Sequence, residues 1–321
     1  MKLQQLRYAV EVYRHNLNVS EAAEALFTSQ PGVSKQIRLL EEELGVQIFI
    51  RSGKRIAAVT RAGQAILETA EQVLRSVHNI KNIGSEFSQT HSGSFAVAAT
   101  HTLMRFRLPE TVAAFRAMYP DVRLVLKQGG PDELADMVAN GVADLALSKD
   151  MQAEPAGLRK LGFGSWHYVL VLPKAHALLE KPAVSLEDVA ALPLLTYPFS
   201  FDAGALAARA FARARLTWQT VFESDDSEVL KDYVRLGLGA GLLDAAAFDA
   251  ARDADLAAVD VSHLFERGEY KILLRGDALL RGFAYDFIAM LDASLTRERV
   301  NHLMFSGCLK RGLPCAVSSC V

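Results

Sequence analysis

The stretch FTSQPGVSKQIRLLEEELG predicts a helix whose first turns carry polar and basic side chains. Its apolar positions recur every three or four residues and form one stripe, at Val33, Ile37, Leu40 and Leu44. The residues away from this stripe near the helix start are Gln30, Pro31, Ser34, Lys35 and Arg38. Amides, hydroxyls and lysines at such a helix end can bond to base edges, and cations can pair with phosphates. A solvated helix face is the alternative, and the neighbouring elements must decide between them.

A second set of residues falls where predicted strands end in the later two-thirds of the chain. It comprises Thr100, His101, Thr102, Gln128, Gly129, Ser148, Lys149, Ser200, Phe201, Asp202, Asp225 and Asp226, with Trp166 at a predicted crossing. In open α/β sheets, ligands bind beyond the carboxyl ends of strands. For any one of these residues helix capping is an equal explanation, but the set as a whole predicts a small-molecule site.

The elements around the first group predict a helix-turn-helix followed by a hairpin. A helix begins at Asn18, with Glu21 completing a capping box, and the polar helix follows after a tight turn. VQIFIRSGKRIAAVT then reads as two strands joined at Ser52-Gly53. Between Val46 and Gly63 there is no acidic residue, and the basic residues are Arg51, Lys54, Arg55 and Arg61. A basic hairpin beside a polar helix end favours binding to a nucleic-acid duplex over an ordinary charged hairpin.

A long helix is predicted from Thr60 to about Phe87. Ile66, Val73, Ile80 and Phe87 recur every seven residues, which favours a partner helix and hence a dimer. Packing against the same chain is the alternative.

After residue 90, strands alternate with helices, which predicts two α/β lobes with parallel sheets. The predicted strands include GSFAVAAT, VRLVLKQGG, ADLALSK, YVLVLP, PLLTYP and YKILLR.

Length, composition and charge limit the classes of protein to which the chain can belong. The 321 residues suggest two or three domains, and a net charge of −2 leaves local patches to decide the partner. The start of the chain lacks the apolar core of a signal peptide and no window suits a membrane span, so we expect a cytoplasmic protein without membrane contact. The tail cysteines match no zinc pattern, and we expect no metal and no cofactor; they are Cys308, Cys315 and Cys320. GLGAG at 237–241 and GFGSW around Ser165 are weak enzyme signals because their spacing and context are wrong.

Several of these motifs resemble those of one family. SQPGVSKQIRLLEEELG, IFIRSGKR and VTRAGQAIL are similar to the LysR-type transcriptional regulators, while MKLQQLRY, ATHT and DYVRLGLGAGLL resemble their CysB-like branch, regulators of sulfur assimilation. The resemblance implies a winged helix-turn-helix at 1–59, a linker and dimerisation helix at 60–90, and a two-lobed α/β effector domain at 91–296. That domain would resemble periplasmic binding proteins, with lobe 1 at about 91–164 and 267–296, lobe 2 at about 165–266, and a tail at 297–321.

The resemblance also implies the partners. Gln30, Pro31, Ser34 and Lys35 would face base edges of promoter DNA, and the phosphates would lie against Thr28, Arg38, Arg51, Lys54 and Arg55. We expect a homo-oligomer, a dimer or a tetramer, that also meets RNA polymerase.

The implied effector is an anionic or acetylated sulfur-pathway compound. Its site would include Thr100, Thr102, Leu103, Gln128, Lys149, Trp166 and Asp202. Leu103 stands where the branch has glutamine, and Lys149 and Asp202 stand where it has threonine. The two charged residues could grip the effector, pair with each other across the cleft, or point to solvent. The alternatives are a LysR-type regulator of another pathway, a two-lobed solute-binding protein, or an enzyme.

Overall fold

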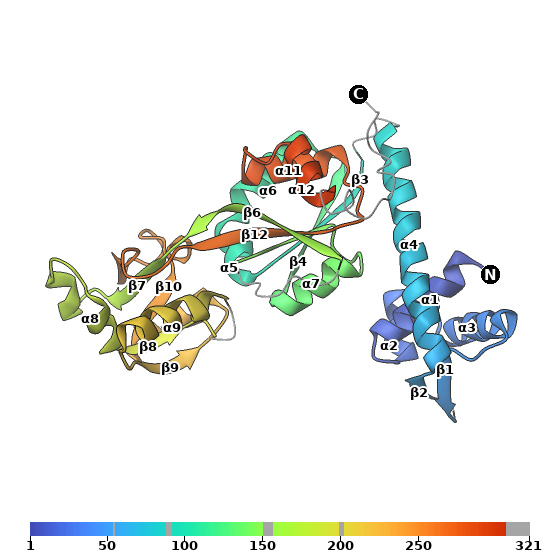
Figure 1. Ribbon diagram of the computed structural model, residues 1–321, viewed down its shortest axis with the longest axis horizontal. Helices are drawn as coiled ribbons and strands as arrows, with labels where there is room; N and C mark the ends of the chain where they lie inside the picture. Colours follow the sequence, from blue (N-terminus) through green and yellow to red (C-terminus); the bar gives the residue numbers. More distant parts are fainter. Residues whose placement is uncertain (54, 88–91, 150–156, 199–201, 306–321) are drawn as a thin grey trace. The chain divides into compact units, whose positions relative to one another are not determined.

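A computed structural model describes residues 1–53, 55–87, 92–149, 157–198 and 202–305 of the chain (Figure 1). The chain divides into two compact units, Met1–Gln89 and Thr90–Val321. In the described residues, no helix is long and apolar enough to cross a membrane.

The first unit consists of four helices and a hairpin. They are α1 (Leu3–Arg14), α2 (Val19–Ala25), α3 (Gln30–Leu44), β1 (Phe49–Ser52), β2 (Arg55–Val59) and α4 (Arg61–Phe87). Asn18 caps α2 by accepting bonds from two backbone N–H groups, as its sequence pattern predicts. The side chain of Thr60 accepts a bond from the N–H of Gly63 and so starts α4. The three helices before the hairpin and the first turns of α4 share one core.

The second unit contains two five-stranded sheets, each with helices on its faces. The lobe 1 sheet has the order β4-β3-β5-β12-β6. Its strands are β3 (Gly93–Ala99), β4 (Val122–Gln128), β5 (Leu145–Ser148), β6 (Leu158–Trp166) and β12 (Gly268–Arg275). One face carries α6 (Leu108–Met118), α11 (Gly282–Leu291) and α12 (Arg297–Phe305), and the other carries α7 (Pro131–Ala139) (Figure 1). The short helix α5 (His101–Phe106) follows β3 directly.

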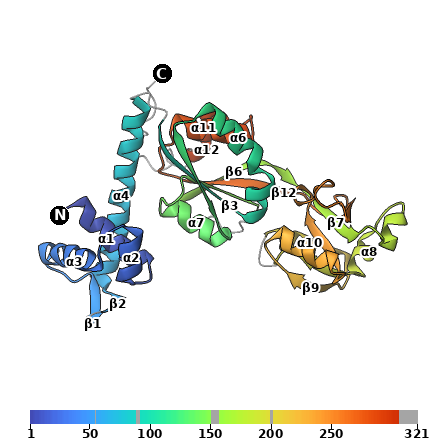
Figure 2. The ribbon, with the colours of Figure 1, turned by 180° about the vertical axis from the view of Figure 1, so that it is seen from behind.

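The lobe 2 sheet has the order β11-β7-β10-β8-β9. Its strands are β7 (Tyr168–Pro173), β8 (Pro193–Thr196), β9 (Gln219–Glu223), β10 (Ala240–Asp244) and β11 (Leu256–Asp260). The helical segments are η1 (Ala177–Glu180), α8 (Leu186–Ala190), α9 (Asp202–Ala214), α10 (Ser227–Arg235) and η2 (Ala245–Ala247). Helix α9 faces the viewer in Figure 1 and α10 faces the viewer in Figure 2, so they cover opposite faces of the sheet.

Both sheets are mixed, which corrects the prediction of parallel sheets. Strands β4, β3 and β5 run parallel to one another, as do β9, β8 and β10. Strands β6, β7, β11 and β12 are added in antiparallel pairs. The antiparallel pairs arise because one strand in each sheet, β12 in lobe 1 and β7 in lobe 2, runs in the direction opposite to its neighbours.

A paired ribbon forms one of these crossings. Only His167 separates β6 in one sheet from β7 in the other. Gly268, the first residue of β12, pairs with Trp166, the last residue of β6. A Cβ at Gly268 would lie 2.1 Å from the indole ring, so glycine leaves the room that Trp166 fills.

A hydrophobic core runs through both lobes, and it contains a helix that the sequence analysis did not anticipate. Val300 and Met304 of α12 are buried in it, although residues 297–321 were expected to form a tail. The three cysteines lie outside the described residues.

Candidate functional site

Helix α3 presents the polar face that its sequence predicts. Val33, Ile37 and Leu40 are buried, and the side chain of Ser29 accepts a bond from the N–H of Gly32 at the helix start. Leu44, predicted as part of the apolar stripe, is 38% exposed, because α3 ends there and Gly45 turns the chain away.

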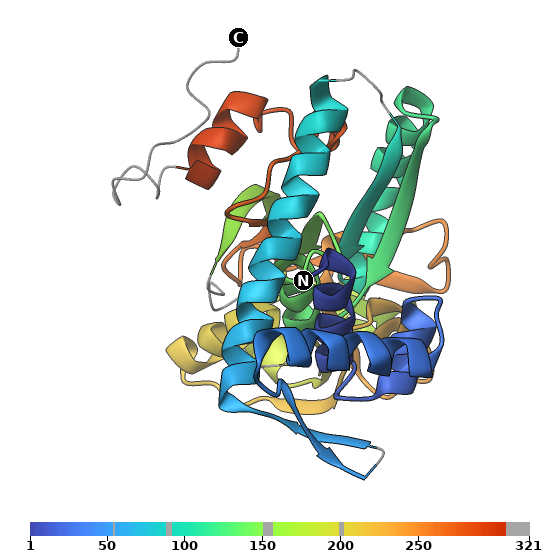
Figure 3. The same cartoon turned by 90° about the vertical axis from the view of Figure 1, so that its right-hand side faces the viewer.

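A groove of about 530 Å³ lies between α3 and the hairpin. Figure 3 shows the hairpin projecting below helix α3. It is lined by Gln30, Pro31, Ser34, Lys35, Arg38, Leu39, Glu42, Arg51 and Gly53. The structure therefore brings together most of the residues predicted to contact DNA, with three cations along one groove. Thr28 is half-buried and Arg55 is exposed, but neither lines the groove. Lys54 lies outside the described residues.

Glu41 fixes the hairpin to the helix, a role that the sequence analysis missed. Its Oε1 accepts bonds from the N–H groups of Ile48 and Phe49, at 2.9 and 3.0 Å. Its Oε2 lies 3.4 Å from a guanidinium nitrogen of Arg51. The carboxylate thus holds both the base of the hairpin and the arginine of the groove. No spacing rule marks Glu41 among the three consecutive glutamates of α3.

The second candidate site is a cavity of about 10 Å³ between the lobes, which we call the inter-lobe cavity. It is lined by Thr100, His101, Thr102, Gly129, Gly130, Pro131, Lys149, Tyr197 and Asp225. Of the predicted effector residues, Thr100, Thr102 and Lys149 line it. Leu103 is buried in the core and Gln128 is exposed at the end of β4; neither lines the cavity. Asp202 begins α9, but its side chain lies outside the described part of the chain.

Lys149 is the buried cation of this cavity. It is 3% exposed, so the interpretation that it points to solvent is wrong. Its Nζ lies 3.8 Å from Oδ2 of Asp244 and 3.4 Å from the centre of the Tyr197 ring. Among the described residues, Lys149 pairs with the carboxylate of Asp244, at the end of β10. The pair with Asp202 stays a prediction, because the side chain of Asp202 lies outside the described part of the chain.

Asp244 is held from both lobes. Its carboxylate accepts bonds from Tyr270 Oη at 3.0 and 3.2 Å and from the N–H of Ala246 at 3.0 Å. Burial, and then the adjacent Asp244 carboxylate, raise the pKa of Tyr270, so the phenol stays protonated and donates.

A chain of hydrogen-bonded hydroxyl groups also connects the two lobes. Thr102 bonds to Ser227 at 3.0 Å, and Ser227 bonds to Tyr197 at 2.8 Å. The oxygen of Tyr197 accepts from the N–H of Asp244 at 3.1 Å. Thr102 therefore bridges the lobes instead of capping a helix, and Asp226, not Asp225, caps α10.

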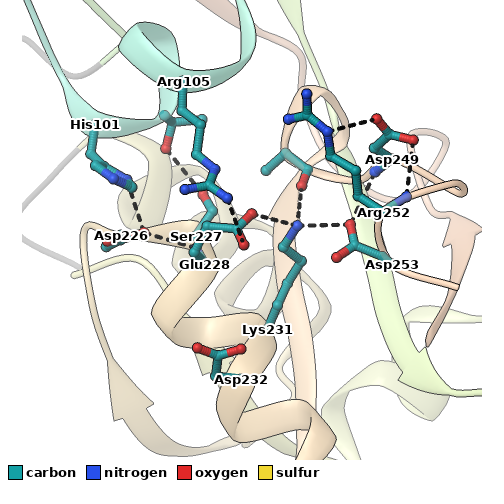
Figure 4. A network of polar contacts seen from close by, with 12 residues as sticks. His101, Arg105, Asp226, Ser227, Glu228, Lys231, Asp232, Asp249, Arg252 and Asp253 are labelled. Carbon is teal, nitrogen blue, oxygen red and sulfur yellow. Dashed lines mark hydrogen bonds and ion pairs between the residues drawn. The ribbon is translucent and has the colours of Figure 1, made fainter. Parts of the chain in front are cut away.

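Ion pairs extend this contact outward (Figure 4). His101 Nδ1 lies 2.8 Å from Asp226, and Arg105 lies 3.4 Å from Glu228. Glu228 also contacts Lys231 at 2.6 Å, and this buried lysine pairs with Asp253 at 2.7 Å and donates to the carbonyl of Ala247 at 2.8 Å. Arg235 bonds to the other oxygen of Asp253 at 2.7 Å.

The hydroxyl of Thr100 and the indole N–H of Trp166 are buried and have no hydrogen-bond partner among the described residues. Trp166 was predicted as an effector residue. The centre of its ring lies 5.3 Å from Nζ of Lys149, but Trp166 does not line the cavity.

The chain matches two family descriptions. Residues 3–64 match "Bacterial regulatory helix-turn-helix protein, lysR family", and residues 88–296 match "LysR substrate binding domain".

Named relatives match over nearly the whole chain. It is 39% identical over 304 residues to the transcriptional regulator SsuR of Burkholderia cenocepacia, covering 95% of this chain and 99% of that protein. The regulator CysB of the same organism is also 39% identical over 304 residues, covering 95% and 97%. The regulator cbl of Escherichia coli is 37% identical over 300 residues, covering 94% and 95%.

Solved structures agree with the fold. The cofactor-binding domain of the Cbl transcriptional regulator superposes with a TM-score of 0.64 at 34% identity, covering 66% of this chain and 94% of that one. Full-length CbnR in complex with its target DNA has a TM-score of 0.61 at 20% identity, covering 92% and 100%, which supports the fold alone. These matches and the two sites above agree: the chain belongs to the LysR family of DNA-binding transcriptional regulators, in its CysB-like branch.

Proposed function

We propose that this regulator senses a small anionic or acetylated sulfur-metabolism compound and controls genes for sulfur assimilation or for the use of sulfonates and sulfate esters. The observation that carries the proposal is the identity of 37–39% to CysB, SsuR and cbl over at least 94% of the chain. The buried cation of the inter-lobe cavity supports a negatively charged effector. The protein would act in the cytoplasm, as a dimer or tetramer on promoter DNA, with RNA polymerase as a further partner.

The test of the effector class is a thermal-shift screen with acetylserine, sulfate, thiosulfate and an alkylsulfonate. A ligand that binds only the native state raises the melting temperature. Neutral sugars and dicarboxylates serve as controls. If only compounds from outside sulfur metabolism raise the melting temperature, the regulator belongs to another pathway.

For DNA, we propose that Gln30, Pro31, Ser34 and Lys35 face base edges and that Thr28, Arg38, Arg51, Lys54 and Arg55 lie against phosphates. The groove between α3 and the hairpin supports this division, because it combines polar helix residues with cations from both elements.

The test is promoter binding by Lys35→Ala and Arg51→Ala over a salt series. Loss of a phosphate contact at Arg51 should weaken binding to all sequences alike and lower the salt slope by about one unit. Loss of Lys35 should relax the preference at one base position, at a cost of about 1–3 kcal/mol.

The matched control is Arg7→Ala, which removes an exposed cation of α1 that does not line the groove. An unchanged salt slope for Arg51→Ala, or the same slope change for Arg7→Ala, would show that the hairpin is not the phosphate contact.

A further inference from the structure

Lys149, which lines the inter-lobe cavity, lies close to a buried carboxylate of the other lobe. Lys149 follows β5 in lobe 1, and Asp244 ends β10 in lobe 2. Their side chains are 2% and 1% exposed. Removing two charges from water costs several kcal/mol for each ion, and the attraction between them repays this only with good geometry. At 3.8 Å, the contact from Lys149 to Asp244 is longer than a hydrogen bond.

Asp244 does not depend on Lys149 for its hydrogen bonds. Tyr270 and the N–H of Ala246 already donate to both of its oxygens. Lys149 could therefore leave Asp244 for another anion while the carboxylate kept its other partners.

The cavity that Lys149 lines is too small for an effector in this structure. Its volume of about 10 Å³ is near the lower limit for one water molecule. A small ligand could enter if the ammonium group moved away from Asp244 and from the ring of Tyr197.

One further group of the cavity can bond to a ligand. The hydroxyl of Thr100 lines the cavity and has no hydrogen-bond partner within the described ranges. A compact oxyanion would accept from this hydroxyl and would pair with the ammonium group of Lys149.

We propose that Asp244 is a built-in competitor that determines effector affinity and selects for anions. The carboxylate neutralises Lys149 until a sulfate or sulfonate group replaces it, and only a ligand with enough negative charge can do so. This inference rests on the proposed function, because it takes the inter-lobe cavity as the effector site.

The test is calorimetry with inorganic sulfate and ethanesulfonate on the full-length parent, Asp244→Asn, Lys149→Met and the double variant. Asp244→Asn should tighten anion binding by about tenfold to a thousandfold, the range by which an opposite charge at ~4–6 Å biases an ionised group. Lys149→Met should abolish anion binding in both backgrounds. Equal affinities of the parent and Asp244→Asn for both anions would overturn the proposal.

The matched control is Asp253→Asn, which removes the carboxylate from another buried lysine, Lys231, that does not line the cavity. An equal gain in sulfate affinity for this control would show a general effect of removing a carboxylate from the protein and would also overturn the proposal. Circular dichroism checks folding, and Asp244→Ala is the second variant. If neither Asp244 variant folds, the test is the rise in melting temperature that sulfate causes in the parent and in Lys149→Met. Equal rises in the two proteins would count against the proposal.

Promoter binding separates this inference from the proposed function. If the parent binds promoter DNA and responds to a sulfur compound, but Asp244→Asn gains no affinity, the competitor role fails and the function stands. If no sulfur compound raises the melting temperature of the parent and none alters its promoter binding, the proposed function itself fails.

Discussion

At the scale of single residues, the inter-lobe cavity shows what a sequence can indicate about a site. Thr100, Thr102 and Lys149 were found because each follows a predicted strand. The same rule could have found Asp244, which ends the strand AGLLD, but nothing in the sequence says that its carboxylate meets Lys149. The two residues are distant in the chain, and only the packing of the two sheets places them together. Tyr197 and Tyr270 were missed because an aromatic residue near a strand end is more often part of a core.

Asp253 provides a residue-scale prediction on acid stability. Burial would raise its pKa, but hydrogen bonds from Lys231, from the N–H of Asp249 and from Arg235 lower it below the ordinary value of 3.8. A lowered folded-state pKa means that the stabilisation is complete above about pH 4 and is lost as the pH falls through the folded-state pKa. Asp253→Asn should therefore cost about 3 kcal/mol at pH 7, because it removes the buried carboxylate that pairs with Lys231, and less at pH 3. Urea unfolding at both pH values measures this, and an equal cost at both would contradict it.

At the scale of elements, the long helix α4 has two different halves. Ile66 and Val73 of the predicted seven-residue repeat pack against the core of their own unit. Ile80 is 66% exposed and Ile83 is 41% exposed. The period alone could not separate these cases, because a seam for a partner helix and a face for the same chain have nearly the same spacing. The alternative of packing on the same chain is confirmed for the first half only.

The exposed half of α4 gives a prediction about assembly. Ile80→Glu with Ile83→Glu should yield folded protein with weakened self-association, since charges would replace the apolar contacts between partner helices. Analytical ultracentrifugation measures the oligomeric state. Thr69→Glu with Gln72→Glu adds the same charge to exposed positions of the buried half and should leave assembly unchanged. An intact oligomer in the first variant would move the interface elsewhere.

At the scale of the whole molecule, the hydrophobic cores define the units that unfold together. The helix-turn-helix unit has its own core, whereas one core cluster contains residues of both lobes. The sequence predicted two lobes from the alternation of strands and helices. It could not predict that they share a core, because that depends on the crossing strands β6, β7 and β12.

From these cores we expect two thermal unfolding transitions, although the chain has three folded parts: the helix-turn-helix unit and the two lobes. Differential scanning calorimetry should show one transition for the first unit and one for both lobes, because a shared core unfolds cooperatively. An anion that binds the inter-lobe cavity should raise only the transition of the lobes. Phe49→Ala, in the core of the first unit, should lower the other transition alone. Separate transitions for the two lobes would show that the shared core does not couple them.

The pairing of Trp166 with Gly268 restricts how the two lobes can move. A single extended strand between two lobes allows rotation in any direction, whereas two strands that are hydrogen-bonded edge to edge form a stiffer ribbon. Such a ribbon can bend perpendicular to its plane and can twist. It resists sliding of one strand along the other, because sliding would break the hydrogen bonds between the two backbones. Since an added Cβ at Gly268 would lie 2.1 Å from the indole, a substitution there should push the two strands apart and distort the ribbon. The separation of Lys149 from Asp244 should therefore follow the bending and twisting of this ribbon, which would let a single bound anion set the relative orientation of the two sheets.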